Sequence, residues 1–260
     1  MPHALVDPES VPVELRPYLG ELVRRTRVIC GDGLVSVFAV GSVALGDYRH
    51  GRSDVDVTVV VAPSVGAAEL RELAESLGAL PCPAAGLELV VYDSDFLGRP
   101  SGAAGYLLDL NTGPLLTNRV SFDSIGAQAF WYVIDRSIGY QAGCLLYGEP
   151  VRRVLAAPGR RELSAAISDS VREHADGMGH LADNQVLNGC RSVAFCREGR
   201  WSAKRVAARA IARSEPEFRA LIETALRSFE RPRAEALALP ATEVRAFLAW
   251  VRESVDAFTH

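Results

Sequence analysis

The first half of the chain alternates short apolar runs with segments whose apolar residues have helical spacing. Runs rich in valine and leucine at 34–40, 55–61 and 87–92 predict three buried strands. Apolar residues recur every three or four positions over 13–29 and 67–77, which predicts two helices. The segment 98–114 is rich in glycine and turn-forming residues and predicts a surface loop.

From residue 124 onward the apolar spacing is helical almost without interruption. We expect helices at 124–144, 161–175, 184–197, 203–212, 217–229 and 242–257. A mixed region followed by helices alone indicates two domains. The sequence therefore predicts an α/β (α+β) N-terminal domain with a small mixed sheet over 1–155, followed by an all-α helical bundle over 156–260.

Two polar segments lie at the ends of the predicted strands of the first domain. Gly41 and Ser42 follow the first strand, where a turn into a helix offers backbone N–H groups and a hydroxyl to phosphate oxygens. Asp54 and Asp56 begin the second strand and point to one face of it, about 7 Å apart. Two such carboxylates repel each other unless a cation lies between them, and Mg²⁺ is the natural occupant. Together the segments predict a nucleoside triphosphate site rather than a solvated strand end.

A third carboxylate, Glu88, lies inside the predicted strand 87–92. Burying a carboxylate is costly unless it is paired or coordinated. If this strand lies beside the one that carries Asp54 and Asp56, Glu88 joins them; otherwise it faces solvent between two leucines. Asp93 and Asp95 follow the same strand in a turn-like sequence, where capping is the more usual role.

Residues 41–47, Gly-Ser-Val-Ala-Leu-Gly-Asp, and 53–56, Ser-Asp-Val-Asp, resemble the signature of the polymerase-beta-like nucleotidyltransferase superfamily. Segments 146–150, 186–191 and 197–204 are similar to one branch, the aminoglycoside adenylyltransferases that modify streptomycin and spectinomycin. The resemblance covers most of the chain. It implies an antibiotic-resistance type of reaction, in which AMP passes from ATP to a hydroxyl of an aminoglycoside or aminocyclitol-like molecule and pyrophosphate is released.

The resemblance also assigns the metal and catalytic residues. It implies that Asp54 and Asp56 bind Mg²⁺ and through it the triphosphate. Glu88 falls at the family's third carboxylate, so it is expected both as a metal ligand and as the base that deprotonates the acceptor hydroxyl.

The resemblance places nucleotide-binding residues in both domains. In the first domain these are Gly41, Ser42 and Ser53. In the second they are Arg191 and Lys204, which is the only lysine of the chain. Arginine offers a planar fork to phosphate oxygens and lysine a point charge.

Acceptor recognition departs from the branch in two places. The branch has a tryptophan in the loop after the third strand, where this chain has Leu-Asn-Thr-Gly-Pro at 110–114. The branch also has an aspartate just before the arginine-bearing helix, where an ungapped alignment places Leu181 of this chain. The identity of the drug is therefore left open. Trp131 and Tyr132 lie in an apolar helical segment and are expected in the core. Each candidate acceptor contact has a polar side chain with an oxygen that can bind a polycation. The candidates are Glu88, Asp109, Asp176, Asp183 and Asn188.

Charge and cysteine content narrow the class of protein. A net charge of −4 argues against binding to nucleic acid. The five cysteines include no C-x-x-C pair, which indicates reduced thiols of a cytoplasmic protein rather than a zinc site. No apolar leader or membrane-length run is visible. We expect a monomer whose partners are ATP and a small acceptor.

Two alternatives retain the nucleotidyltransferase fold. The first is an antitoxin or protein AMPylator that acts on a partner protein, although such proteins are usually single domains. The second is a regulator that binds a nucleotide without catalysis. Intact carboxylates at 54, 56 and 88 argue against the regulator, because binding alone needs no base.

Overall fold

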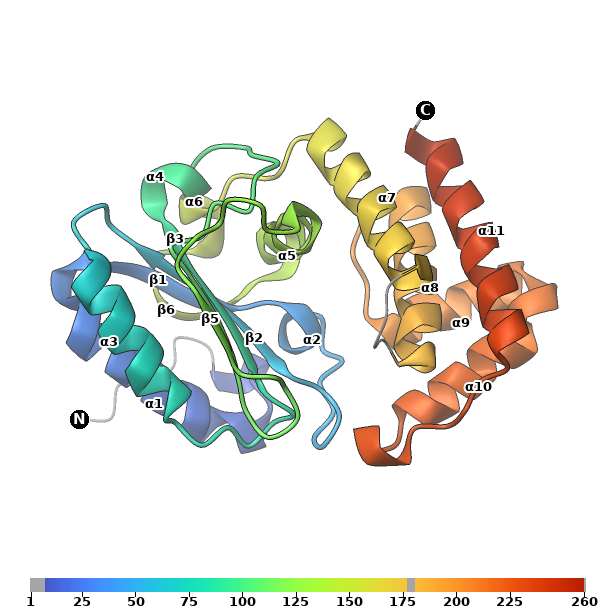
Figure 1. The fold of residues 1–260 in the computed structure, drawn as a ribbon, viewed down its shortest axis with the longest axis horizontal. Coiled ribbons are helices and arrows are strands. Elements are labelled where there is room, and N and C mark those ends of the chain that lie inside the picture. The colour runs from blue at the N-terminus through green and yellow to red at the C-terminus, as the bar shows by residue number, and fades with distance from the viewer. Residues whose placement is uncertain (1–7, 177–180, 260) are drawn as a thin grey trace. The chain divides into compact units, whose positions relative to one another are not determined.

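The computed structural model describes residues 8–176 and 181–259. The N-terminal residues on which the expected absence of a leader depends lie partly outside this range. The chain divides into two compact units, Met1–Gly159 and Arg160–His260. The predicted boundary at 155/156 falls in the connection between the last helix of the first unit and the first helix of the second (Figure 1).

The N-terminal unit combines one sheet with helices on both of its faces (Figure 1). In chain order its elements are α1 (Arg16–Cys30), β1 (Leu34–Ala39), α2 (Gly41–Ala44), β2 (Val55–Val61), α3 (Ala67–Gly78), β3 (Leu87–Asp93), α4 (Ser94–Leu97), β4 (Leu108–Thr112), β5 (Arg119–Ser121), α5 (Ala129–Ala142), β6 (Cys144–Gly148) and α6 (Val151–Val154).

The sheet has the strand order β5-β4-β3-β2-β1-β6. Strands β2 and β3 are parallel, and the other neighbouring pairs are antiparallel. The chain returns from β2 to β3 through α3, the connection that a parallel pair requires. The predicted mixed sheet is confirmed, and the parallel pair at its centre carries Asp56 and Glu88.

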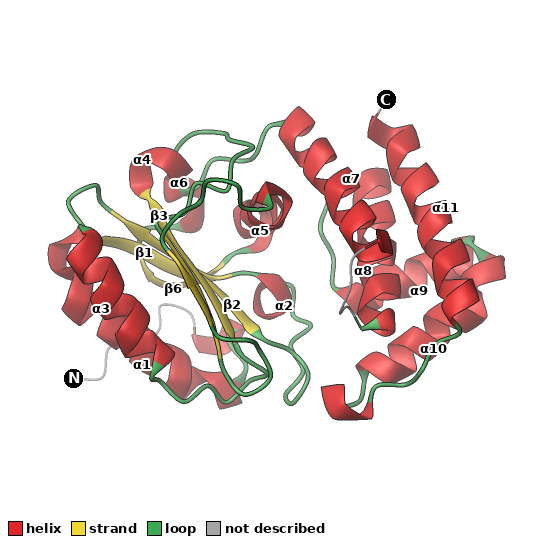
Figure 2. Cartoon of the chain, in the orientation of Figure 1, coloured by secondary structure: helices red, strands yellow, loops and turns green. Residues whose placement is uncertain are grey.

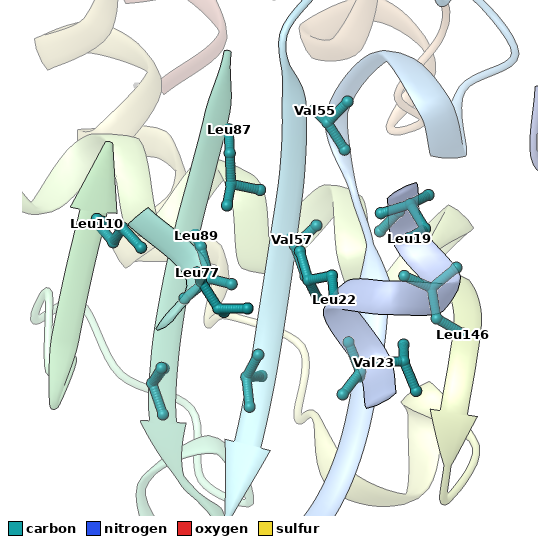
Figure 3. Close-up of a cluster of buried hydrophobic side chains, with 14 of the residues drawn as sticks. Leu19, Leu22, Val23, Val55, Val57, Leu77, Leu87, Leu89, Leu110 and Leu146 are labelled. Atoms are coloured by element: carbon teal, nitrogen blue, oxygen red, sulfur yellow. The ribbon is translucent and has the colours of Figure 1, made fainter. Parts of the chain in front are cut away.

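One face of the sheet packs against α1 and α3 through a continuous apolar core. Because side chains alternate along a strand, every second residue of β2 and β3 enters this core. Figure 3 shows Val55 and Val57 of β2 beside Leu87 and Leu89 of β3, all of them buried. The intervening residues of both strands therefore point to the opposite face.

The opposite face is only partly apolar. A second cluster of buried side chains covers the far ends of its strands, with Phe38, Val60 and Tyr92 packed against residues such as Tyr132 of α5 and Val154 of α6. Toward the start of β2 and β3 the same face carries polar side chains. The sheet thus holds the carboxylates on a rigid support.

The second unit is helical in all of its regular elements (Figure 2). These are α7 (Arg160–Asp176), α8 (Ala182–Glu198), α9 (Lys204–Ser214), α10 (Arg219–Phe229) and α11 (Ala241–Thr259). Helix α8 packs against α9, α10 and α11, and α7 packs against α11. The buried residues Val186, Val193 and Phe247 are part of this interior. The predicted helical bundle is confirmed.

Two predictions for the first unit were wrong. The segment 98–114 is not only a loop, because it contains β4, whose Leu108 and Leu110 are buried in the core. The helix predicted over 124–144 is too long at both ends: α5 runs from Ala129 to Ala142, and β6 follows as an unpredicted edge strand paired with β1. Both strands are short, and pairing with a distant strand rather than local periodicity stabilises them.

Candidate active site

The two aspartates and the glutamate lie on neighbouring parallel strands. Asp54 immediately precedes β2, Asp56 is its second residue, and Glu88 is the second residue of β3. In the register of the two strands Asp56 stands directly opposite Glu88. Both point away from the apolar core that receives Val55 and Val57. The strands are therefore adjacent, which is the arrangement that joins Glu88 to the aspartates.

The surroundings of Glu88 disfavour its negative charge. Burial, followed by the charges of Asp54, Asp135 and Asp109, raises the pKa of Glu88 to about 8, while Arg119 acts in the opposite direction. This carboxyl can therefore hold a proton close to neutral pH. A proton acceptor whose pKa lies near the working pH is suited to general base catalysis.

Gly41 brings the backbone into contact with Asp56. Its φ is +55°, and a Cβ atom at this position would overlap the carboxylate of Asp56. The preceding residue, Val40, donates its N–H to the carbonyl of Asp56 at 3.0 Å. The turn between β1 and α2 is therefore fixed directly beside this aspartate, and only glycine fits there.

Ser42 follows this glycine in the first turn of α2. Its Oγ atom is buried and has no hydrogen-bond partner among the described residues. A buried hydroxyl without a partner costs free energy unless a ligand or water satisfies it. Ser42 therefore offers a donor at the place where the sequence predicts phosphate oxygens.

Ser53 has a partner within its own loop. Its hydroxyl accepts the N–H of Arg49 at 3.1 Å, and its carbonyl accepts the N–H of Ala85 at 3.0 Å. These bonds fix the chain just before Asp54. The nucleotide-binding role expected for Ser53 stays a prediction.

The described residues include two candidate Mg²⁺ ligands, Asp54 and Asp56, but no preformed cluster of three metal-binding side chains. Among residues 8–176 and 181–259, no three His, Cys, Asp or Glu side chains converge as a metal site. Mg²⁺ bound with a triphosphate needs only one or two protein carboxylates, because phosphate oxygens and waters complete its shell. Asp54 and Asp56 fit this requirement, since they are oxygen donors beside a turn with an unsatisfied buried hydroxyl. Glu88 as a third ligand stays a prediction.

A network of one hydrogen bond and one ion pair lies beside Glu88, and the sequence did not predict it. The phenol of Tyr132 donates to Asp109 at 2.5 Å, and Arg119 binds the same carboxylate at 2.9 Å. Burial, followed by the hydrogen bond and charge of Asp109, raises the pKa of Tyr132. Tyr132 is buried, as expected, but its hydroxyl has a polar partner. The signal in the sequence is a helical face that carries both Tyr132 and Asp135 in an otherwise apolar segment.

Asp109, a candidate contact to the acceptor substrate, is bonded to other protein side chains. Asp109 is buried and pairs with residues of β5 and α5 rather than with solvent. Asp93 likewise has a structural partner, because its side chain accepts the N–H groups of Asp95 and Phe96 at the start of α4. The interpretation of Asp93 as a capping residue is confirmed.

In the helical unit, the expected phosphate-binding residues lie next to polar and aromatic side chains. Lys204 at the start of α9 donates to the side-chain oxygen of Asn184 at 3.3 Å. The guanidinium of Arg191 lies 5.7 Å from the centre of the Trp201 ring. The structure therefore brings Asn184 of α8 and Lys204 of α9 together.

Asn188 lies one turn further along α8 and contacts a buried histidine. His174 Nδ1 lies 2.8 Å from the carbonyl of Ser170, which can only accept, so Nδ1 carries the proton. Nε2 of His174 then accepts the amide of Asn188 at 2.8 Å. The side-chain oxygen of Asn188 is buried and has no partner in the described part of the chain. Its expected contact with the acceptor stays a prediction.

Asp183 is held inside the helical unit. It is 1% exposed and accepts the hydroxyl of Ser228 and the N–H of Asn184, the latter at 2.7 Å. The bond to Ser228 ties α8 to α10. The expected acceptor contact of Asp183 is untested, and the structure gives the residue a stabilising role instead. Asp176 is exposed at the end of α7.

Parts of the sequence match two family models, and the fold is similar to that of a solved structure. Residues 23–82 match the model of a nucleotidyltransferase domain, and residues 153–254 match the model of an aminoglycoside adenylyltransferase C-terminal domain. A search of curated proteins gave no match. The crystal structure of spectinomycin adenyltransferase AAD(9) from Enterococcus faecialis with ATP and spectinomycin has a similar fold, with a TM-score of 0.71 and 17% identity. The similarity covers 92% of this chain and 99% of that chain.

The described elements include no membrane-crossing segment. No helix in residues 8–176 or 181–259 is long and apolar enough to span a bilayer.

Proposed function

Because the chain belongs to the nucleotidyltransferases of the aminoglycoside adenylyltransferase branch, we propose that it transfers AMP from ATP to a hydroxyl group of an aminoglycoside or aminocyclitol-like molecule. The observation that carries the proposal is the register of β2 and β3, which sets Asp56 opposite Glu88. Beside this pair the Gly41 turn leaves the hydroxyl of Ser42 without a partner in the described residues. Carboxylates beside a phosphate-binding turn suit phosphoryl transfer.

The reaction requires a balanced exchange at the α-phosphorus of ATP. The acceptor oxygen forms a bond to this phosphorus, and the bond from the phosphorus to the oxygen bridging to the β-phosphate breaks. Pyrophosphate leaves with that bridging oxygen, and the hydroxyl proton passes to Glu88. The raised pKa of Glu88 supports this role, because the residue can hold the proton that it receives.

Asp54 and Asp56 would hold Mg²⁺, which supplies neutralisation of the triphosphate charge when bound. Within the protein, Ser42 donates to a phosphate oxygen, and Gly41 lets the carboxylate of Asp56 lie directly against the backbone of this turn. In the helical unit, Arg191 and Lys204 contribute positive charge to phosphate binding. The neighbour crystallised with ATP and spectinomycin supports ATP as the donor and an aminocyclitol as the acceptor class.

The proposal is tested by incubating the protein with ATP, Mg²⁺ and a panel of streptomycin, spectinomycin, hygromycin-type and 2-deoxystreptamine compounds. Mass spectrometry should find one acceptor that has gained one AMP. Glu88→Gln should bind ATP normally but transfer AMP about 10²- to 10⁴-fold more slowly, whereas the control Glu72→Gln, an exposed position on α3, should behave as the parent protein.

The outcomes separate the parts of the proposal. Wild-type transfer by Glu88→Gln would exclude Glu88 as the base. ATP binding without AMP transfer to any compound would exclude the proposed acceptor class. For the helical unit, Lys204→Gln should weaken ATP binding in calorimetry, while Arg209→Gln on the same helix, an exposed arginine, should not. Equal affinities of these two variants would remove Lys204 from the site.

A further inference from the structure

The helical unit contains a cavity apart from the residues assigned above. It has a volume of about 420 Å³ and lies along α7 and α11, two helices that pack side by side (Figure 2). The side chains that line it and matter for its chemistry are Arg161, Ser164, Ser168 and Arg172 of α7, and Arg252 and Asp256 of α11.

The sequence spacing explains how these residues share one cavity. On α7 the four residues follow each other at intervals of three or four, which places them on one face of the helix. Arg252 and Asp256 are likewise four residues apart on α11. The serines between the longer arginines are short, so the surface is hollow where they lie.

The positive charge of this cavity is only partly neutralised. Arg172 is paired with Asp169 at 2.7 Å, and its Nε donates to the carbonyl of Ser168 at 3.3 Å. Among the described residues, neither Arg161 nor Arg252 forms an ion pair with a carboxylate. The lining therefore holds three guanidinium groups and one carboxylate, that of Asp256.

Asp256 adds a hydrogen-bond acceptor to the same cavity. Its carboxylate lies 3.5 Å from the hydroxyl of Ser168, which donates to it. A carboxylate among arginines does not suit a simple anion alone. It suits a molecule that has a phosphate at one end and hydroxyl groups at the other.

We propose that this cavity binds a small organic phosphate that also carries hydroxyl groups, as sugar phosphates and nucleotides do. The guanidinium groups of Arg161 and Arg252 bind the phosphate oxygens, and Asp256 accepts a hydroxyl of the ligand. Guanidinium forks match phosphate oxygens in geometry and charge. The volume falls in the range of small-molecule sites, and the net charge of −4 argues against a nucleic acid as the ligand.

The test uses the full chain, without ATP, and ribose 5-phosphate as the probe in isothermal titration calorimetry, with ribose as the uncharged control. We expect the parent protein to bind one ribose 5-phosphate and not ribose. The double substitution Arg161→Gln/Arg252→Gln should weaken binding about tenfold or more, since charge-assisted hydrogen bonds are lost. The matched control Arg209→Gln/Arg213→Gln removes two exposed arginines of α9 and should keep the parent affinity.

Each other outcome overturns the proposal. No binding by the parent protein excludes an organic phosphate site. Equal weakening in both double variants shows a general charge effect. Loss of binding in Lys204→Gln together with normal binding in Arg161→Gln/Arg252→Gln shows that the probe occupies the nucleotide site. Near-identical unfolding midpoints of the double variants serve as the check that both remain folded.

Discussion

Replacing Gly41 with alanine tests the contact on which the proposed site depends. The residue has a φ of +55°, and a new Cβ would overlap the carboxylate of Asp56. The Cβ of Asp56 itself would lie 3.2 Å away. The backbone of Asp56 cannot retreat easily, because it lies between β1 and β3 and accepts the N–H of Val40 at 3.0 Å. The carboxylate must therefore rotate out of its place.

Two effects add up in this variant. An L-residue in the left-handed region costs about 1–2 kcal/mol of folding free energy. The displaced carboxylate adds a functional loss, because a misplacement of about 1 Å in a catalytic group costs about 10²-fold in rate. We expect Gly41→Ala to unfold at lower urea concentration and to bind Mg²⁺ and ATP about tenfold or more weakly.

Gly46→Ala is the matched control. Gly46 has a φ of +66° in the same region of the chain, but a Cβ there would have no atom within 4 Å. The free energy of unfolding of Gly46→Ala should fall by a similar amount, about 1–2 kcal/mol. Its Mg²⁺-dependent affinity for ATP should not change. Calorimetric titration with ATP measures binding without requiring the acceptor to be known. If both variants bind Mg²⁺ and ATP equally well, the carboxylate of Asp56 is not part of the nucleotide site.

Three further predictions concern buried polar groups. In metal-free protein, burial and neighbouring carboxylates raise the pKa of Glu88 from 4.5 to about 8, so between these values the folded state binds more protons than the unfolded state. The free energy of unfolding should therefore fall as pH rises through this interval, and Glu88→Gln should flatten the fall in urea melts. Tyr132→Phe removes the donor to Asp109 and should cost about 1–3 kcal/mol in the same assay; an unchanged stability would mean that this bond contributes nothing. Asp183→Ala removes the acceptor of the buried Ser228 hydroxyl and should cost about 2 kcal/mol, whereas the exposed Asp176→Ala should stay within about 0.5 kcal/mol of the parent.

The central strands and most helices follow from local patterns. The runs at 34–40, 55–61 and 87–92 are β1, β2 and β3 to within a residue or so. Helices α7 to α11 also lie close to their predicted ranges. Each of these elements buries a regular apolar face, and that periodicity is written in the sequence. The Gly41–Ser42 turn and the Asp54–Asp56 pair were predictable for the same local reason.

Tertiary structure decided the rest. Strands β4, β5 and β6 are short, and backbone pairing with neighbouring strands stabilises them. The contact of Tyr132 with Asp109 and the burial of Asp183 against Ser228 join residues far apart in the chain. The sequence by itself determined which residue types could perform the chemistry. Only packing decided which carboxylates face the site and which are held inside the protein, because the fate of a polar side chain depends on the partners that a distant part of the chain supplies.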